Sequence, residues 1–239
     1  MKGAVCVVAT CLALYAVPPA SAFPPLRDFA VIWLFLVDDL HIDFRTTGIV
    51  RTWLASLSKE LIRDDDVFAA RSTGPSSLSV GLLAAPEDLQ AGIRRLSGAA
   101  LKAEEVLKSP EGVDEVFYRA KVAMRTATEF LSTAPQHDPR RKVMLYIGKG
   151  FDTSDPLSDE TQTLLTEAWR LHVTLIALDP SALPRARAPV PYLADAERMR
   201  RLNAARATLE RLALPTQGFV LADEEALRNA AVRISNAVR

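Results

Sequence analysis

The feature that most constrains the fold is the apolar run of residues 29–37, which ends abruptly at Asp38 and Asp39. The run is rich in β-branched and aromatic residues and has no polar residue in alternation, which is typical of a strand buried on both faces. Such strands belong to parallel sheets covered by helices. Ligand sites of these sheets lie at the carboxyl ends of the strands, so the acidic step after Val37 marks the expected position of a functional site.

The first 22 residues have the pattern of a secretory signal peptide. Lys2 provides a positive charge, residues 4–17 form an apolar run too short to span a bilayer, and residues 20–22 read Ala-Ser-Ala. We therefore expect residues 1–22 to be cleaved after Ala22 and residues 23–239 to form one domain that is secreted or periplasmic. No second long apolar run follows, so we expect no integral membrane segment after cleavage.

The composition of the remaining domain narrows its class. Both cysteines, Cys6 and Cys11, lie in the predicted leader, so the domain is expected to have no disulfide and to depend on an ordinary hydrophobic core. Lys2 is the one charge of the leader, which leaves 28 basic and 29 acidic residues after cleavage. This balance gives no indication of a nucleic-acid partner.

Helix and strand patterns alternate along the rest of the chain. Short apolar runs between turn residues predict strands at 29–37, 67–70, 78–83, 143–147, 173–178 and 218–221. Apolar residues at helical spacing predict helices at 46–62, 86–96, 113–131, 158–170, 195–214 and 224–238. The turn at Gly74-Pro75 predicts a hairpin, with one antiparallel strand at an edge. The predicted fold class is α/β, with a doubly wound, mostly parallel sheet that has one antiparallel edge strand.

This order of elements resembles the von Willebrand factor type A (vWA) domain. It is most similar to the vWA-related domain of exported bacterial proteins, in which an acid pair followed by Leu-His closes the first strand. The resemblance rests on residues 37–41, 143–152 and 209–238 and covers residues 28–239. It implies a vWA/Rossmann-like fold and a function in binding another macromolecule, here a protein partner that the sequence does not identify.

The best-known site of that family is a metal-ion-dependent adhesion site, which holds Mg²⁺ through Asp-x-Ser-x-Ser, a threonine and a second aspartate, all oxygen donors. With Asp38 as the first ligand, Leu40 and Ile42 stand where the serines belong. The threonine position falls near Ala84-Ala85. None of these side chains can bind a cation, so the comparison predicts a degenerate adhesion site with no cofactor.

Lys149 follows the strand predicted at 143–147, at the position of the family's second aspartate. An ammonium group there would repel a cation, and we expect it to pair with Asp38 or Asp39 in place of the metal. A shifted register offers an alternative, because Asp39, His41 and Asp43 are three groups capable of binding a divalent metal. Imidazole favours zinc or another transition metal over Mg²⁺. The alternative function is therefore a divalent-metal-binding protein or hydrolase, with Asp152 or Asp155 as substitute ligands.

Other enzyme classes fit less well. A phosphoryl-accepting receiver domain needs a further aspartate on a middle strand, and a haloacid-dehalogenase phosphatase needs Asp-x-Asp, whereas Asp38 begins Asp-Asp-Leu. His137 and His172 lie far from His41 in the sequence, and no Ser-His-Asp set can be assembled. We therefore predict no catalytic residue and favour binding over catalysis.

The candidate binding residues are those expected at the carboxyl ends of the strands: Asp38, Asp39, His41, Asp43, Lys149 and Asp152. Two further segments have alternative interpretations. The arginine-rich helix at 198–211 presents either a solvated face or a surface for an acidic partner. The proline-rich loop at 180–191 is expected to be exposed, and is either a recognition segment or an insertion without a role.

Overall fold

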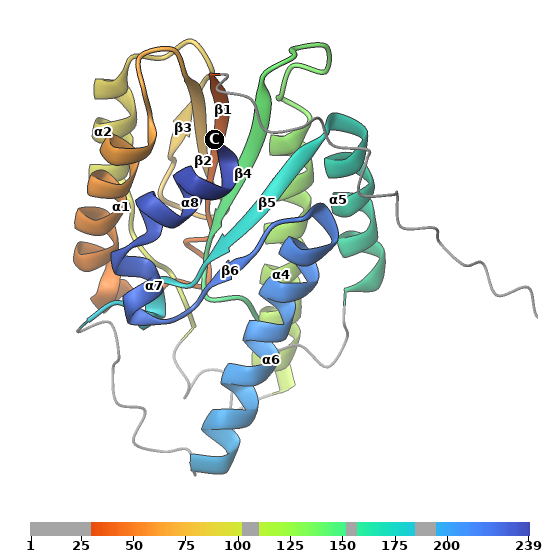
Figure 1. Cartoon of the computed structure of the whole chain (residues 1–239). Helices are drawn as coiled ribbons and strands as arrows, with labels where there is room; N and C mark the ends of the chain where they lie inside the picture. Colours follow the sequence, from red (N-terminus) through yellow and green to blue (C-terminus); the bar gives the residue numbers. More distant parts are fainter. Residues whose placement is uncertain (1–29, 102–109, 152–156, 185–194) are drawn as a thin grey trace, which may run out of the picture.

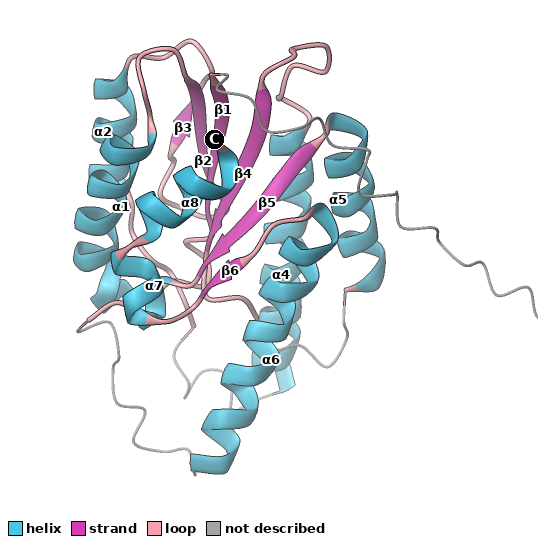
Figure 2. Ribbon diagram, in the orientation of Figure 1, coloured by secondary structure: helices cyan, strands magenta, loops and turns pink. Residues whose placement is uncertain are grey.

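A computed structural model describes residues 30–101, 110–151, 157–184 and 195–239 and shows a six-stranded sheet between two layers of helices (Figures 1 and 2). The strands are β1 (Val31–Val37), β2 (Val67–Ser72), β3 (Ser79–Val80), β4 (Arg141–Ile147), β5 (Val173–Leu178) and β6 (Val220–Leu221). The helices are α1 (Thr47–Leu61), α2 (Pro86–Arg95), α4 (Pro110–Leu131), α5 (Ser158–Leu171), α6 (Asp195–Ala213), α7 (Glu224–Arg228) and α8 (Ala230–Val238). Short 3₁₀ turns are η2 (Phe44–Thr46), η3 (Pro180–Ala182) and η4 (Leu214–Thr216).

The strand order is β3-β2-β1-β4-β5-β6. Every neighbouring pair is parallel except β2 and β3, which pair antiparallel at one edge of the sheet. This arrangement confirms the predicted fold class. The chain builds outward from β1 in one direction through β2 and β3, and then in the other through β4, β5 and β6. The switch point of the sheet therefore lies between β1 and β4.

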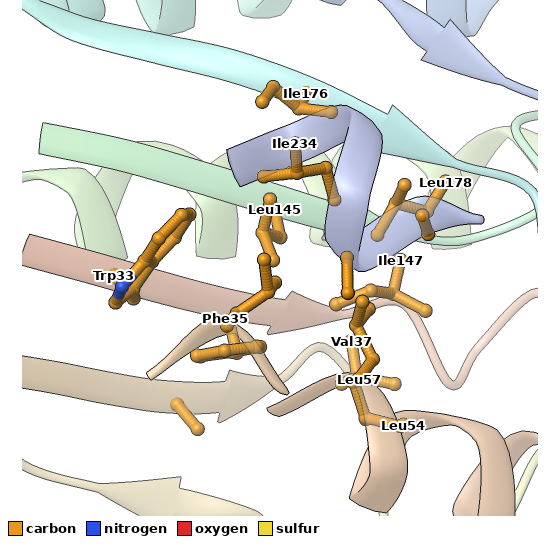
Figure 3. Close-up of a cluster of buried hydrophobic side chains, with 14 of the residues drawn as sticks. Trp33, Phe35, Val37, Leu54, Leu57, Leu145, Ile147, Ile176, Leu178 and Ile234 are labelled. Atoms are coloured by element: carbon orange, nitrogen blue, oxygen red, sulfur yellow. The ribbon is translucent and has the colours of Figure 1, made fainter. Parts of the chain in front are cut away.

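Burial of β1 on both faces explains why its sequence has no alternating polar residues. All seven of its residues are buried. Alternate side chains point to opposite faces of a strand, and here each face meets a separate hydrophobic cluster. Figure 3 shows the cluster on one face, where Trp33, Phe35 and Val37 pack near side chains of α1 and α8. Ile32, Leu34 and Leu36 join the other cluster, which includes α4, α5 and α6.

Asp66 anchors the beginning of β1. Its carboxylate accepts hydrogen bonds from the Val31 amide at 2.7 Å and from the Trp33 indole at 2.9 Å, and it forms an ion pair with Arg239. Burial raises the pKa of Asp66, but the hydrogen bonds from Arg239, Arg63 and β1 outweigh it and leave the pKa below its ordinary value. The buried carboxylate thus ties the turn before β2 to β1 and to the last helix.

The register brings the carboxyl ends of four strands to one edge of the sheet. Val37 pairs with Ser72 of β2 and with Ile147 of β4, and Ile147 pairs with Leu178 of β5. The residues that follow these four positions therefore lie along the same edge, which we call the carboxyl edge.

Two element boundaries differ from the sequence-based expectation. Strand β3 has two residues where 78–83 was predicted, because the chain turns at Gly81, whose carbonyl accepts from the Ala84 amide at 3.1 Å. The last helix is divided at Asn229 into α7 and α8. Its predicted start is confirmed, since the Asp223 side chain accepts from the Ala226 amide at 2.7 Å.

The loop after β5 was expected to be exposed, but its first part is not. Pro180, Ala182 and Leu183 are buried, because η3 folds back onto the core. The rest of that loop (185–194) and the predicted signal peptide lie outside the described residues. Within the part of the chain that the structure describes, no helix combines the length and apolar character needed to cross a membrane.

The turn before β6 generates a stability prediction. A Cβ atom on Gly218 would lie 1.6 Å from the Leu175 carbonyl oxygen, whereas one on Gly81 would meet nothing within 4 Å. We expect Gly218→Ala to lower the free energy of unfolding by about 3 kcal/mol or to prevent folding, because the clash is with backbone. Gly81→Ala is the control and should stay within about 0.5 kcal/mol of wild type in urea denaturation. Equal midpoints for the two variants would contradict the described packing.

Candidate functional site

The acid pair lies at the carboxyl edge, directly after β1. The Asp38 amide donates to the Ile147 carbonyl at 2.8 Å, and the Thr73 amide donates to the Val37 carbonyl at 3.0 Å, so the sheet ladder continues one residue beyond each strand. Asp38 and Asp39 are 0% and 1% exposed. Two carboxylates are therefore buried side by side, and each needs internal hydrogen-bond donors.

Asp38 finds its donors on both neighbouring strands. The Thr73 hydroxyl, just beyond β2, donates to Oδ1 at 2.8 Å, while the Tyr146 hydroxyl on β4 donates to Oδ2. His41 Nδ1 lies 2.7 Å from the same Oδ2. Burial raises the pKa of Asp38, but the charge and hydrogen bonds of its partners outweigh burial and bring the pKa below its ordinary value. Asp38 is therefore a carboxylate at neutral pH.

Tyr146 takes the opposite role in that pair. Burial, the Asp38 charge and the hydrogen bond to Asp38 raise its pKa well above the usual tyrosine value. Its phenol thus stays protonated and remains a donor across the physiological range. The Tyr146 side chain thereby ties β4 to the loop that follows β1.

Asp39 points toward the turn between β2 and β3. Its Oδ1 accepts from the Gly74 amide at 2.5 Å and lies 3.2 Å from the Thr73 hydroxyl, whose single proton it shares with Asp38. Its Oδ2 accepts from the Ser76 amide at 3.0 Å and from the Ser76 hydroxyl. A Cβ atom on Gly74 would lie 2.9 Å from Oδ1, so the absence of a side chain there permits this close approach. The amide and hydroxyl groups of this turn thus form an anion-binding site that the Asp39 carboxylate occupies.

The loop after α2 closes over the acid pair. The Ala99 amide donates to the Asp39 carbonyl at 2.8 Å, and the Ala100 amide donates to the Ile42 carbonyl at 3.0 Å. Arg51 Nε donates to the Leu96 carbonyl at 2.6 Å, which fixes the start of the loop to α1. The sequence comparison placed the family's threonine near Ala84-Ala85, but β3 runs away from the carboxyl edge. Residues 97–100, not 84–85, reach the site.

Among the described residues, one ring nitrogen of His41 has no partner. Nδ1 contacts Asp38, but Nε2 is buried and makes no hydrogen bond. The ring packs against Phe151 with the ring centres 5.3 Å apart and the planes tilted by 42°. His41 thus links the loop after β1 to the loop after β4.

Asp43 and Lys149 are the accessible members of the predicted site. Asp43 accepts from the Arg45 amide at 2.8 Å and pairs with the Arg45 guanidinium at 2.7 Å. These contacts are the main reason why the pKa of Asp43 lies below its ordinary value, with a smaller contribution from the charge of Lys149. Lys149 is exposed and forms no ion pair with Asp38 or Asp39 among the described residues. The predicted pairing of Lys149 with Asp38 or Asp39 is therefore not formed. Hydroxyl and amide groups and His41 contact these two carboxylates instead.

These side chains do not converge on a point where a cation would bind. The carboxylate of Asp39 faces the turn at Gly74, the His41 ring faces Asp38, and Asp43 faces Arg45. Within the described ranges, no group of three or more His, Cys, Asp and Glu side chains is placed to hold a metal ion. The donor set of the shifted register does not fit a metal in this arrangement. Asp152, the remaining predicted residue, lies outside the described residues.

The sequence analysis missed the donors of this network. Gly74 appeared only as part of a predicted turn and Tyr146 only as part of a buried strand, while Thr73 and Ser76 were not singled out. A usable signal was present, because a polar turn directly follows β2, the strand next to the acid pair. The other histidines play no part here: His137 precedes β4 and His172 precedes β5, so both lie at the opposite edge.

Comparison with known proteins shows a likeness of fold. No protein-family model matches the chain, and no curated protein matches it. The conserved hypothetical protein BatB from Bacteroides thetaiotaomicron aligns over 87% of this chain and 98% of its own, with a TM-score of 0.50 and 15% identity. An aerotolerance-related membrane protein from Bacteroides fragilis aligns over the same shares, 87% and 98%, with a TM-score of 0.54 and 12% identity. This chain has a vWA-like fold.

The pilus adhesin SpaC from Lactobacillus rhamnosus GG is a third similar structure. It aligns over 90% of this chain with a TM-score of 0.52 and 10% identity, and the match spans 31% of the adhesin. The vWA-like fold thus occurs both in proteins of similar length to this chain and as one part of a larger protein. At these identities the likeness concerns the fold alone.

The buried network predicts unequal effects for two aspartates of one loop. Asp39→Asn places an amide NH₂ against N–H and O–H donors, so we expect the free energy of unfolding to fall by about 2 kcal/mol. The control, Asp43→Asn, removes a half-exposed pair with Arg45 and should cost less than about 1 kcal/mol. Urea denaturation of both variants measures the difference. Equal losses would show that Asp39 does not hold the turn at Gly74.

Proposed function

We propose that this chain is an exported protein-binding module of vWA-like fold with a degenerate metal-ion-dependent adhesion site. The observation that carries the proposal is that all four carboxylate oxygens of the acid pair accept hydrogen bonds from the protein itself. Both oxygens of Asp38 and both oxygens of Asp39 accept hydrogen bonds from side chains or amides of the neighbouring loops. In this proposal the two carboxylates hold the loops in place, and a partner binds to the exposed side chains of those loops.

The proposed partner surface consists of the exposed residues around this buried pair. Phe44, directly after the loop of the acid pair, is 71% exposed, and Arg45 and Lys149 are also exposed. Phenylalanine and arginine are both enriched in protein–protein interfaces relative to the rest of the surface. In this proposal Asp38, Asp39 and His41 position the loops, while Asp43 and Lys149 face the partner. Export is inferred from the signal-peptide pattern of residues 1–22.

Partner capture tests the proposal. Tagged mature protein is incubated with a cell-envelope extract of the source organism, and retained proteins are quantified. We expect Phe44→Ala combined with Lys149→Glu to lose a partner that the wild type retains, because both side chains lie on the proposed surface. Leu83→Ala is the matched control, since Leu83 is 98% exposed but follows β3, away from the carboxyl edge. An identical set of retained proteins for all three would refute the proposal.

A divalent-metal-binding protein or hydrolase using Asp39, His41 and Asp43 is the second candidate. The observation in its favour is His41 Nε2, a buried nitrogen that makes no hydrogen bond within the part of the chain that the structure describes. Rotation of the Asp39 and Asp43 side chains away from their present partners would be needed to join it. That rearrangement would break the hydrogen bonds that hold the turn at Gly74.

Thermal unfolding with Mg²⁺, Mn²⁺, Ca²⁺ or Zn²⁺ distinguishes the two candidates. A metal that binds only the folded protein at a hundred times its dissociation constant adds about 2.7 kcal/mol of stability. We expect no shift relative to a sample with chelator, because the acid pair is already saturated with donors. A shift that disappears in His41→Ala would instead establish the metal site.

A further inference from the structure

Helix α8 and the beginning of β6 border an open groove on one face of the sheet. The groove has a volume of about 370 Å³ and is lined by Phe219, Arg233, Asn236 and Ala237. Phe219 directly precedes β6, and the other three residues belong to α8 and are exposed. The ring of Phe219 is partly buried against the core, and the groove leaves its remaining surface open.

Arg141 lies at one end of this groove. As the first residue of β4, it pairs in register with Val31 of β1, and its guanidinium donates to the Val238 carbonyl at 3.2 Å, next to Ala237 of the groove. Burial lowers the pKa of Arg141, and among the residues that the structure describes no carboxylate forms an ion pair with it. A half-buried guanidinium without a counter-ion is costly, so this position favours a negatively charged neighbour.

Residues 23–29 have a composition that matches both features. They follow the predicted cleavage site, lie outside the described residues and read Phe-Pro-Pro-Leu-Arg-Asp-Phe. Asp28 is their single acidic residue and stands three positions before Val31. Phe23 and Leu26 supply apolar side chains, and the two prolines between them favour an extended backbone that loses little entropy on docking.

The length of this segment is sufficient to reach the groove. Strand β6 is the third strand from β1 on the β4 side, and a strand spacing of about 4.8 Å places it about 14 Å away across the sheet. The register sets Phe219 level with Phe35, about 13 Å along the strands from Val31. The direct path is therefore about 20 Å. Residues 23–30 span up to about 26 Å when extended, which exceeds that path.

We propose that residues 23–29 form a strap that crosses the beginnings of β4 and β5 and docks in the groove between α8 and β6. Asp28 pairs with Arg141, and the apolar side chains of the strap cover Phe219. The strap thus supplies the counter-ion of Arg141 and removes apolar surface from water. This inference goes beyond the proposed function, because the strap lies at the edge of the sheet opposite the carboxyl edge.

Disulfide trapping tests the docking site, because the expected mature protein has no cysteine of its own. Mature protein with Leu26→Cys and Asn236→Cys is placed in a glutathione redox buffer, and free thiols are titrated over time. Leu26→Cys with Glu60→Cys is the matched control. Glu60 is exposed on α1 and adjoins Leu61, whose carbonyl accepts from Arg239 near the beginning of β1. We expect the groove pair to close about tenfold faster, because docking raises the effective concentration of the strap thiol.

Charge variants in the groove-pair background test the ion pair. Asp28→Arg should slow disulfide closure about tenfold, because two cations then face each other. Addition of Arg141→Asp should restore the rate, since the pair forms again with its charges exchanged. Arg63→Asp is the control for that addition and should not restore the rate, because exposed Arg63 lies beside Asp66, on the α1 side of β1. Urea denaturation under reducing conditions verifies that each variant is folded.

Each other outcome overturns a defined statement. Equal closure rates for the two cysteine pairs refute the strap. A disulfide between two molecules, detected as a dimer by mass spectrometry, shows that a second copy covers the groove and also refutes it. An unchanged rate in Asp28→Arg refutes the pairing with Arg141, and this variant decides alone if Arg141→Asp does not fold. Equal restoration by Arg63→Asp and Arg141→Asp refutes the pairing as well, because the attraction is then not specific to Arg141.

Discussion

The structure at the carboxyl edge depends on the burial of two adjacent carboxylates at the end of β1. Burial of an ionised carboxylate is costly unless donors are already in place around it. Here the donors come from the β2–β3 turn, from Tyr146 on β4 and from His41. Because those elements must all be present for Asp38 and Asp39 to be satisfied, the acid pair couples the loops of three strands into one unit.

That coupling holds the oxygens of the acid pair together through the protein's own donors. A divalent ion would draw the same oxygens together and would itself remain partly exposed to a ligand. Hydroxyl and amide donors satisfy the oxygens but leave no open coordination position. The proposed function accordingly assigns partner binding to side chains that these loops expose, which include Phe44, Arg45 and Lys149.

Helix α6 packs against one of the loops of the carboxyl edge, the loop after β4. Gly150 adopts a positive φ of 72°, and a Cβ atom there would lie 2.3 Å from the Ala205 carbonyl oxygen, so the loop after β4 fits closely beneath the helix. The buried second half of α6 is thus fixed to the same loop that carries Lys149.

The sequence by itself determined the architecture. The unbroken apolar run of β1, the helical spacing in α1 and α4 and the Gly-Pro turn before β3 are local signals, and each reports how a segment must be buried. The position of the acid pair followed from the same logic, because the end of a doubly buried strand in a parallel sheet can lie only at the carboxyl edge.

Only the tertiary structure decided what the acid pair does. Asp39 meets Gly74 and Ser76 across more than 30 residues of sequence, and Asp38 meets Tyr146 across more than 100. These contacts depend on strand order and register, which local patterns do not encode. The expected pairing of Lys149 with the acid pair was wrong for the same reason. Donors from the turn after β2 and from Tyr146 on β4 occupy the carboxylate oxygens instead. The contact of α6 with the loop after β4 likewise depends on tertiary packing, which no helical pattern can report.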